Sequence, residues 1–237
     1  MLIGNNKTLE KDIKELKNKL NEIHYAEITR DCTSCSDWLI KKDYTLTKGA
    51  ANYSFIFILF KVLDEVHPKN ILEFGLGQTT KVTSQYANFY SETSLDVVDN
   101  NQQWIEIFSK KLNISPNMKI HHKDLIKFNL NKIESDKYES LDDIVQNKKY
   151  DLIIIDGPYG FERTYPRTNI LDLIPNNIAN EFVIILDDVE RKGEKNTANL
   201  IFEKLNSSDI QYKTSYQEGV KRQLVITSLN YEYIHWL

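Results

Sequence analysis

Short apolar runs alternate with stretches of helical spacing from residue 70 onward. A short apolar run between turn residues is typical of a buried strand, and apolar residues three and four positions apart are typical of a helix. This alternation predicts an α/β fold with a mainly parallel sheet and helices on both faces. The predicted strands are 71–74, 94–98, 118–122, 150–155, 182–186, 210–216 and 222–228. The last two are joined by a turn too short for a helix, so they should form an antiparallel pair.

Residues 1–66 have a different pattern and are predicted to form an N-terminal helical segment before a domain at 67–237. Leu9, Ile13, Leu16, Leu20 and Ile23 recur at steps of four and three, which is the narrow apolar seam of a coiled coil. Such a seam packs either on its own domain, as a cover, or on a second copy in a homodimer, and the periodicity does not distinguish the two. Residues 50–66 form a second, strongly apolar helix stopped by Pro68.

Composition narrows the possible partners and compartment. The 237 residues carry a net charge of −4, so no overall positive field draws the protein to nucleic acid. We find no apolar run near the ~20 residues that span a bilayer and no secretory signal, which predicts a cytoplasmic protein without a membrane span. Cys32 and Cys35 stand alone as a Cys-x-x-Cys pair, and we expect reduced thiols without a metal.

The predicted strand 71–74 leads through Gly75 and Gly77 into a helix. Glycines let the main chain approach a ligand closely, and the free N–H groups of a helix start favour carboxylate or phosphate. The alternative is a tight connection between strand and helix without a ligand. A nicotinamide-binding motif would have a third glycine at position 80, where this chain has threonine, which argues against a dehydrogenase.

Carboxylates occur where successive predicted strands end. They are Glu73, Asp99, Asp124, Asp156, Asp187 and Asp188. The carboxyl ends of parallel strands share one edge of the sheet, where open α/β folds bind ligands. Any single one of these acids could instead cap a helix or lie in a solvated turn.

Residues 70–228 resemble the class I S-adenosylmethionine-dependent methyltransferases. The resemblance rests on 72–77 (Leu-Glu-Phe-Gly-Leu-Gly) and on 96–100 (Asp-Val-Val-Asp-Asn). It implies a seven-stranded Rossmann-like sheet with an antiparallel last strand and S-adenosylmethionine as cofactor. It also implies that Asp99 holds the ribose, Asp124 lies near the adenine, and Glu73 with Gly75 and Gly77 holds the amino-acid end.

Asp156, Asp187 and Asp188 are similar to the metal-binding acids of divalent-cation-dependent O-methyltransferases of the catechol and macrolide-sugar types. The resemblance implies a bound Mg²⁺ or other divalent cation, with Asp156 both a ligand and catalytic. Alternatively, these acids are turn and cap residues. Those enzymes carry a lysine base shortly after the first metal acid, whereas this chain has Gly157 to Gly160. The base is therefore open, and Tyr159, His121, His122 or a metal-bound hydroxide are the candidates.

The Asp-Gly-Pro sequence at 156–158 also resembles methyltransferases that modify glycans, which implies a sugar hydroxyl as acceptor. Arg163 and Arg167 follow in the same loop, where their positive charge would bind an acidic or phosphorylated sugar. The alternative is an ordinary surface loop that happens to carry two arginines. The sequence thus predicts an O-methyltransferase acting on a sugar, polysaccharide or other small molecule. The alternatives are a non-catalytic nucleotide-binding or assembly protein with this fold, or a metal-independent methyltransferase acting on nitrogen or nucleic acid.

Overall fold

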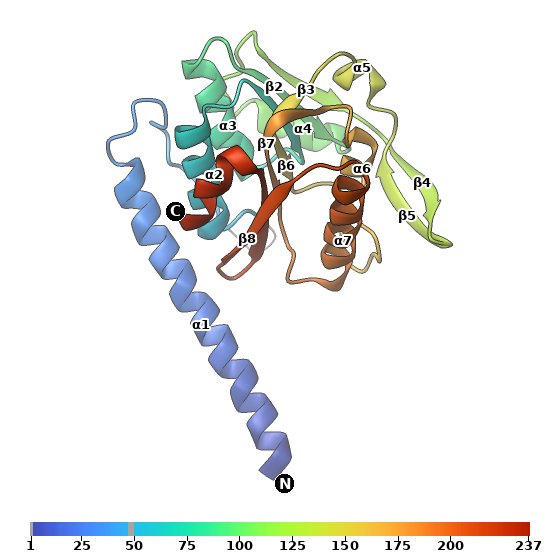
Figure 1. Cartoon of the computed structure of the whole chain (residues 1–237). Helices are drawn as coiled ribbons and strands as arrows, with labels where there is room; N and C mark the ends of the chain where they lie inside the picture. The colour runs from blue at the N-terminus through green and yellow to red at the C-terminus, as the bar shows by residue number, and fades with distance from the viewer. Residues whose placement is uncertain (1, 47–49) are drawn as a thin grey trace.

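A seven-stranded sheet forms the centre of the molecule in the computed structural model, which describes residues 2–46 and 50–237 (Figure 1). Its strand order is β3-β2-β1-β6-β7-β9-β8. The strands are β1 (Asn70–Phe74), β2 (Ser94–Asp99), β3 (Met118–His122), β6 (Tyr150–Ile155), β7 (Ile178–Leu186), β8 (Tyr212–Glu218) and β9 (Arg222–Ser228). Neighbours from β3 to β7 are parallel, and β9 is antiparallel to β7 and β8. The predicted parallel sheet with a reversed last strand is confirmed.

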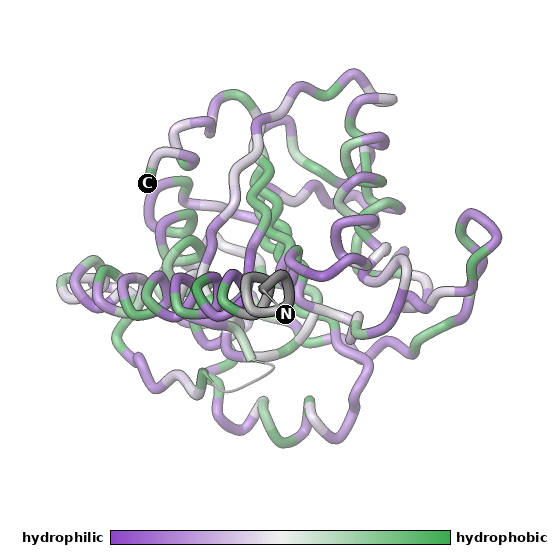
Figure 2. Tube along the Cα trace, turned by 90° about the horizontal axis from the view of Figure 1, so that it is seen from below, coloured by the Kyte–Doolittle hydropathy of each residue, from purple (hydrophilic) through white to green (hydrophobic). Residues whose placement is uncertain are grey.

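Alternate residues of the central strands point to opposite faces, and each face has its own apolar core. Leu152 and Ile154 pack on one side with the helices α2 (Tyr53–Val66), α3 (Gln78–Phe89) and α4 (Gln102–Ser109) and with the terminal 3₁₀ segment η1 (Leu229–Trp236). Ile153 and Ile155 pack on the other side with α5 (Asp142–Val145), α6 (Ile170–Leu173) and α7 (Lys192–Ser207). Figure 2 shows these apolar strands gathered in the middle of the trace. Burial on both faces explains why the strands read as continuous apolar runs.

A separate hairpin, β4 (Leu125–Leu130) with β5 (Ile133–Tyr138), lies beside the main sheet (Figure 1). The sequence did not predict it, because this stretch lacks a regular apolar pattern and several of its residues are exposed. Tyr138 at its end is fully buried and stacks on Phe74 of the central sheet. The hairpin therefore brings one aromatic residue to the carboxyl edge of the sheet.

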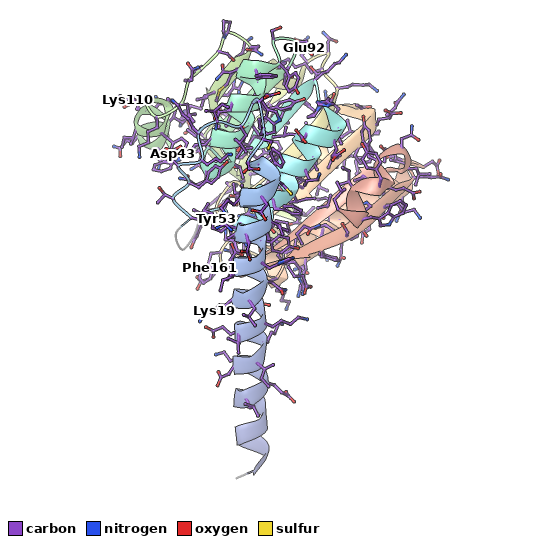
Figure 3. The ribbon with its side chains drawn as sticks, turned by 90° about the vertical axis from the view of Figure 1, so that its left-hand side faces the viewer. Lys19, Asp43, Tyr53, Glu92, Lys110 and Phe161 are labelled. Carbon is purple, nitrogen blue, oxygen red and sulfur yellow. The ribbon has the colours of Figure 1, made fainter. Side chains whose placement is uncertain are left out.

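The N-terminal segment has two parts with different packing. Helix α2 packs on the sheet, whereas α1 (Leu2–Thr33) extends away from the domain as a single long helix (Figures 1 and 3). The carboxyl-terminal half of α1 is held by Asn21, Glu22 and Tyr25, which bond to the end of β8, to the turn after it and to the start of α2. Within the described residues, no helix combines the length and the apolar composition needed to cross a bilayer.

Candidate functional site

Close backbone contact between two loops explains the glycine at position 75. Gly75 has φ +100°, and a Cβ there would lie 3.0 Å from the carbonyl carbon of Asp156. A Cβ on Gly157 would in turn lie 2.8 Å from the Gly75 backbone. Asp156 also donates its N–H to Phe74 O at 2.9 Å. The loops after β1 and β6 therefore touch, and Gly75 and Asp156 lie on the same edge of the sheet.

Gly77 has a different environment from Gly75. It is extended and caps the start of α3, and a Cβ built on it meets nothing within 4 Å. The Gly77 N–H donates to Thr80 Oγ1 at 2.9 Å, which fixes the first turn of the helix. The space in front of Gly77 belongs to an open cavity, so a side chain at this position would occupy room that a ligand could use.

Asp99 ends β2 and faces the glycine loop. Its two carboxylate oxygens accept the N–H groups of Leu76 at 2.9 Å and Asn101 at 2.8 Å. Trp104 donates its indole N–H to Leu76 O at 2.7 Å and so closes the same loop from α4. Burial raises the pKa of Asp99, although these backbone N–H groups act to lower it. Each oxygen keeps a second lone pair that can accept a hydroxyl from a ligand.

Glu73 is fully buried and lies behind the loop. Its carboxylate accepts hydrogen bonds from Thr79 at 2.6 Å, Thr80 at 2.9 Å and Thr83 at 2.7 Å. Burial raises its pKa to about 7, although the three hydroxyl donors act to lower it. Glu73 therefore organises the start of α3. One of its three donors, Thr80, stands at the position where a dinucleotide-binding motif has glycine.

Asp156, Asp187 and Asp188 meet at the ends of β6 and β7, with carboxylate oxygens that all lie within 4.8 Å of one another. Asp187 is fully buried and Asp188 nearly so. Arg167 Nη2 lies 3.2 Å from Asp156 Oδ1 and 2.6 Å from Asp188 Oδ2. Lys221 Nζ lies 3.0 Å from Asp187 Oδ2 and 3.3 Å from Asp188 Oδ1. The acids are therefore already paired with cations of the chain.

Two further side chains complete this network. Arg191 Nη2 lies 2.8 Å from Asp188 Oδ1, an ion pair in which that oxygen has no well-aligned hydrogen bond. Gln223 Nε2 donates to Asp187 Oδ1 at 2.6 Å. Lys221 and Gln223 were not predicted as site residues from the sequence. The reversed strand β9 was the available signal, because its pairing of Leu224 with Leu186 places the start of β9 beside the end of β7.

Burial and the neighbouring charges shift the pKa values of these groups in different directions. Burial and the neighbouring Asp187 raise the pKa of Asp156 well above its ordinary value. Burial acts to raise the pKa of Asp187, but Lys221 and Arg167 hold it below its ordinary value. Burial acts to lower the pKa of Lys221, but the carboxylates, led by Asp187, raise it above the ordinary range. The lysine therefore stays charged at neutral pH.

One cavity of about 560 Å³ joins these parts. The glycine loop, Asp99 and Trp104 lie along it, and so do Asp156, Tyr159, Arg167, Asp188 and Arg191. Tyr159 is 70% exposed and stands at its rim. The prediction that acids from separate strands meet at one edge is confirmed for Asp99, Asp156 and Asp188.

Other predicted site residues do not line this cavity. Glu73 and Asp187 are buried behind it. The Asp124 side chain is 78% exposed, and His122 lies 3.8 Å from it and bonds to Asn100 O.

Arg163 pairs with Asp136 of the hairpin. His121 bonds to Asp96 inside the sheet, at 2.9 Å. Roles for Asp124, His122 and Arg163 remain predictions that this geometry does not support.

Two solved structures with a similar fold are described as O-methyltransferases. TomG, an O-methyltransferase from Streptomyces achromogenes involved in tomaymycin synthesis and solved in complex with SAM, has a TM-score of 0.54 at 12% identity, covering 85% of this chain and 96% of that one. A protein assigned as an O-methyltransferase from Klebsiella pneumoniae has a TM-score of 0.52 at 13% identity, covering 91% and 89%. The chain has the class I methyltransferase fold. No protein-family model and no curated protein matches the sequence.

The site fits S-adenosylmethionine. The open space before Gly77 would receive the amino-acid end that a Cβ would block, and Asp99 offers free lone pairs to ribose hydroxyls. A divalent cation does not fit the three acids as they are arranged. Mg²⁺ needs free oxygen ligands, whereas five of these six carboxylate oxygens lie within 3.3 Å of a nitrogen of Arg167, Arg191, Lys221 or Gln223.

Proposed function

We propose that this protein is an enzyme that transfers a methyl group from S-adenosylmethionine to a hydroxyl oxygen of a small molecule or glycan. The observation that carries the proposal is the single cavity in which the glycine loop and Asp99 meet the carboxylate of Asp156. The loop and Asp99 would bind the nucleoside end of the donor. Asp156 and Tyr159 lie farther along the same cavity, where an acceptor would enter.

The donor supplies a methyl group bonded to a sulfonium sulfur, and the chain supplies position and a base. Tyr159 at the rim and Arg191 beside Asp188 would hold the acceptor so that its hydroxyl oxygen faces the methyl carbon. As the oxygen–carbon bond forms and the carbon–sulfur bond breaks, the hydroxyl proton would pass to Asp156. Burial and the neighbouring Asp187 raise the pKa of Asp156, which makes its carboxylate a stronger base than an ordinary carboxyl.

The acceptor class follows from the mouth of the cavity. Tyr159 offers an exposed aromatic ring, and Arg191 offers guanidinium donors that are partly accessible at 30% exposure. An aromatic face and hydrogen-bond donors beside a carboxylate suit a sugar ring with polar or acidic substituents. This agrees with the resemblance of 156–158 to glycan methyltransferases, so sugar nucleotides and oligosaccharides are the first acceptors to test.

The testing experiment is a methyl-transfer screen read by mass spectrometry. Nucleotide sugars and oligosaccharides are incubated with the full chain and S-adenosylmethionine, once with EDTA and once with Mg²⁺. We expect a product heavier by one methylene group and a loss of at least ~100-fold in rate for Asp156→Asn. The exposed Asp209→Asn, outside the cavity, is the matched control and should keep the rate. Equal rates for Asp156→Asn and the wild type would remove Asp156 from the reaction.

A further inference from the structure

Arg167 is fixed in the middle of the acid cluster by contacts on all sides. The residue is 4% exposed. Its Nη1 donates to Asp187 O at 2.9 Å, and its Nε donates to Pro158 O at 3.4 Å. Its backbone has φ +58°, an uncommon conformation for a residue with a side chain. These contacts hold the guanidinium between Asp156 and Asp188, so its place is part of the fold.

Lys221 reaches the same acids from a different loop, the turn between β8 and β9. Its ammonium bridges Asp187 and Asp188, and the side chain is only 12% exposed. With Arg167 and Arg191, three cations face three carboxylates. Arg191 also contacts the buried Glu194 at 3.5 Å, so four carboxylates face three cations with a formal charge of −1, and a divalent cation would leave the cluster at +1 in a buried site. Burial of uncompensated charge is strongly unfavourable.

We propose that Arg167 and Lys221 permanently occupy the place that a divalent cation would take among Asp156, Asp187 and Asp188, so that the cluster is a metal-free ion network. The inference depends on the proposed function in one respect: if this chain transfers methyl groups, the transfer should not need a divalent metal. The cations would instead position the acids, with Arg167 holding Asp156 at the cavity. Removing one cation should create a divalent-metal site from the same three acids.

Binding of Mn²⁺ to the full chain, followed by electron paramagnetic resonance, tests this directly. We expect the wild type to bind with a Kd of about 1 mM or weaker. Arg167→Gln and, separately, Lys221→Met should each bind one Mn²⁺ at least about tenfold more tightly, and Mn²⁺ should raise the Tm of these variants but not of the wild type. Lys221→Met decides the matter if Arg167→Gln does not fold. Arg163→Gln removes an arginine from the same loop without touching the acids and should bind like the wild type.

Two results of the Mn²⁺ titrations would overturn the inference. One is tight binding of a single Mn²⁺ to the wild type that Asp188→Asn abolishes. The other is no gain of Mn²⁺ binding in either folded variant. Because these readouts do not involve turnover, they remain decisive if the chain shows no methyl transfer, in which case only the proposed function fails. Turnover that EDTA abolishes and Mn²⁺ restores would also contradict the metal-free network.

A second inference concerns helix α1 and stands on different contacts. The five seam residues, Leu9, Ile13, Leu16, Leu20 and Ile23, are each 57–63% exposed. The residues that dock α1 on the domain are Asn21, Glu22 and Tyr25. At about 100° per residue these two sets fall on roughly opposite sides of the helix. The seam therefore faces away from its own domain, which leaves it uncovered. Figure 3 shows the part of α1 around Lys19 extending free of the other elements.

We infer that a second copy of this chain covers the seam in a parallel coiled coil. Leu9, Leu16 and Ile23 take the d positions of the heptads, and Ile13 and Leu20 the a positions. Ile13 at a followed by Leu16 at d favours two strands, whereas Leu20 at a followed by Ile23 at d favours higher oligomers. In that register the g position Asp12 faces the e position Lys17 of the partner subunit on both sides, an attractive pairing. Docking on the opposite side of the helix would place the two domains on the outside of the coiled coil.

Light scattering after gel filtration tests the dimer, with an expected mass of twice 27.8 kDa. Leu16→Glu should give monomers, whereas Lys14→Glu, on the same turn but outside the seam, should stay dimeric. In a Cys32→Ser/Cys35→Ser background, Leu9→Cys and Ile23→Cys should each form a disulfide with the same position of the other copy. A monomeric wild type would overturn the dimer, and failure of both self-crosslinks in a dimer would overturn the parallel arrangement.

Discussion

At the scale of single residues, two glycines of one loop should respond differently to the same substitution. Gly75→Ala forces a side chain onto a φ of +100° and against the Asp156 backbone, so we expect a loss of stability of about 1–3 kcal/mol. The Cβ of Gly77→Ala would have no atom of the chain within 4 Å, so the Tm should stay within a degree or two. The same Cβ would occupy the space assigned to the cofactor, so affinity for S-adenosylhomocysteine should fall at least about tenfold. Thermal unfolding and calorimetry separate the two effects. Equal behaviour of the variants would contradict the assignment of that space to the cofactor.

Also at this scale, Glu73 should give stability a defined pH dependence. Its pKa is about 7 in the folded chain, against 4.5 for an ordinary carboxyl. Between these values the folded state keeps a proton that the unfolded state loses, so the free energy of unfolding falls as pH rises through this window. The difference amounts to about 3 kcal/mol, at about 1.4 kcal/mol per pKa unit. Glu73→Gln should remove this fall, as measured by urea unfolding from pH 4.5 to 8. Parallel pH profiles for the two proteins would contradict it.

At the scale of elements, the sequence predicted the strands that have a clear apolar pattern or clear turn signals at their ends. The strands β3, β6 and β9 have the predicted bounds, because their residues pack on both faces or end at clear turn signals. The hairpin β4–β5 was missed, since its half-exposed strands lack that pattern. The seam of α1 was recognised, but its periodicity could not show which surface receives it. Only the docking contacts of Glu22 and Tyr25 do so.

A prediction at this scale concerns Glu22, which ties three elements together. Its carboxylate accepts the backbone N–H of Tyr53 at the start of α2, the amide of Asn52 and the backbone N–H of Val220 in the β8–β9 turn. Glu22→Ala leaves these donors without their acceptor, at a cost of about 1–3 kcal/mol. Hydrogen exchange should become faster in α1 and in the β8–β9 turn but not in β1 or β6. Unchanged exchange in α1 would show that other contacts hold the helix.

At the scale of the whole molecule, the fold gathers at one edge both the acids that the sequence predicted and cations that it did not. Acids end successive strands, so their meeting follows from the parallel sheet alone. Arg167 was predicted to contact the acceptor, and no role was predicted for Lys221. Both residues lie in loops, and the path of a loop depends on tertiary packing, so their contacts with the acids could not be predicted. The loops therefore decide whether the acids bind a metal or an internal ion network. The sequence could name the acids but not their partners.

The central claim is that the cavity between the glycine loop and Asp99 binds the methyl donor. Calorimetric titration of the full chain with S-adenosylhomocysteine tests it most directly, because binding needs neither an acceptor nor turnover. We predict one site of micromolar affinity and a loss of at least ~1.4 kcal/mol, about tenfold, in Asp99→Ala. Absence of binding to a folded wild type, or equal affinity in the variant, would contradict the claim.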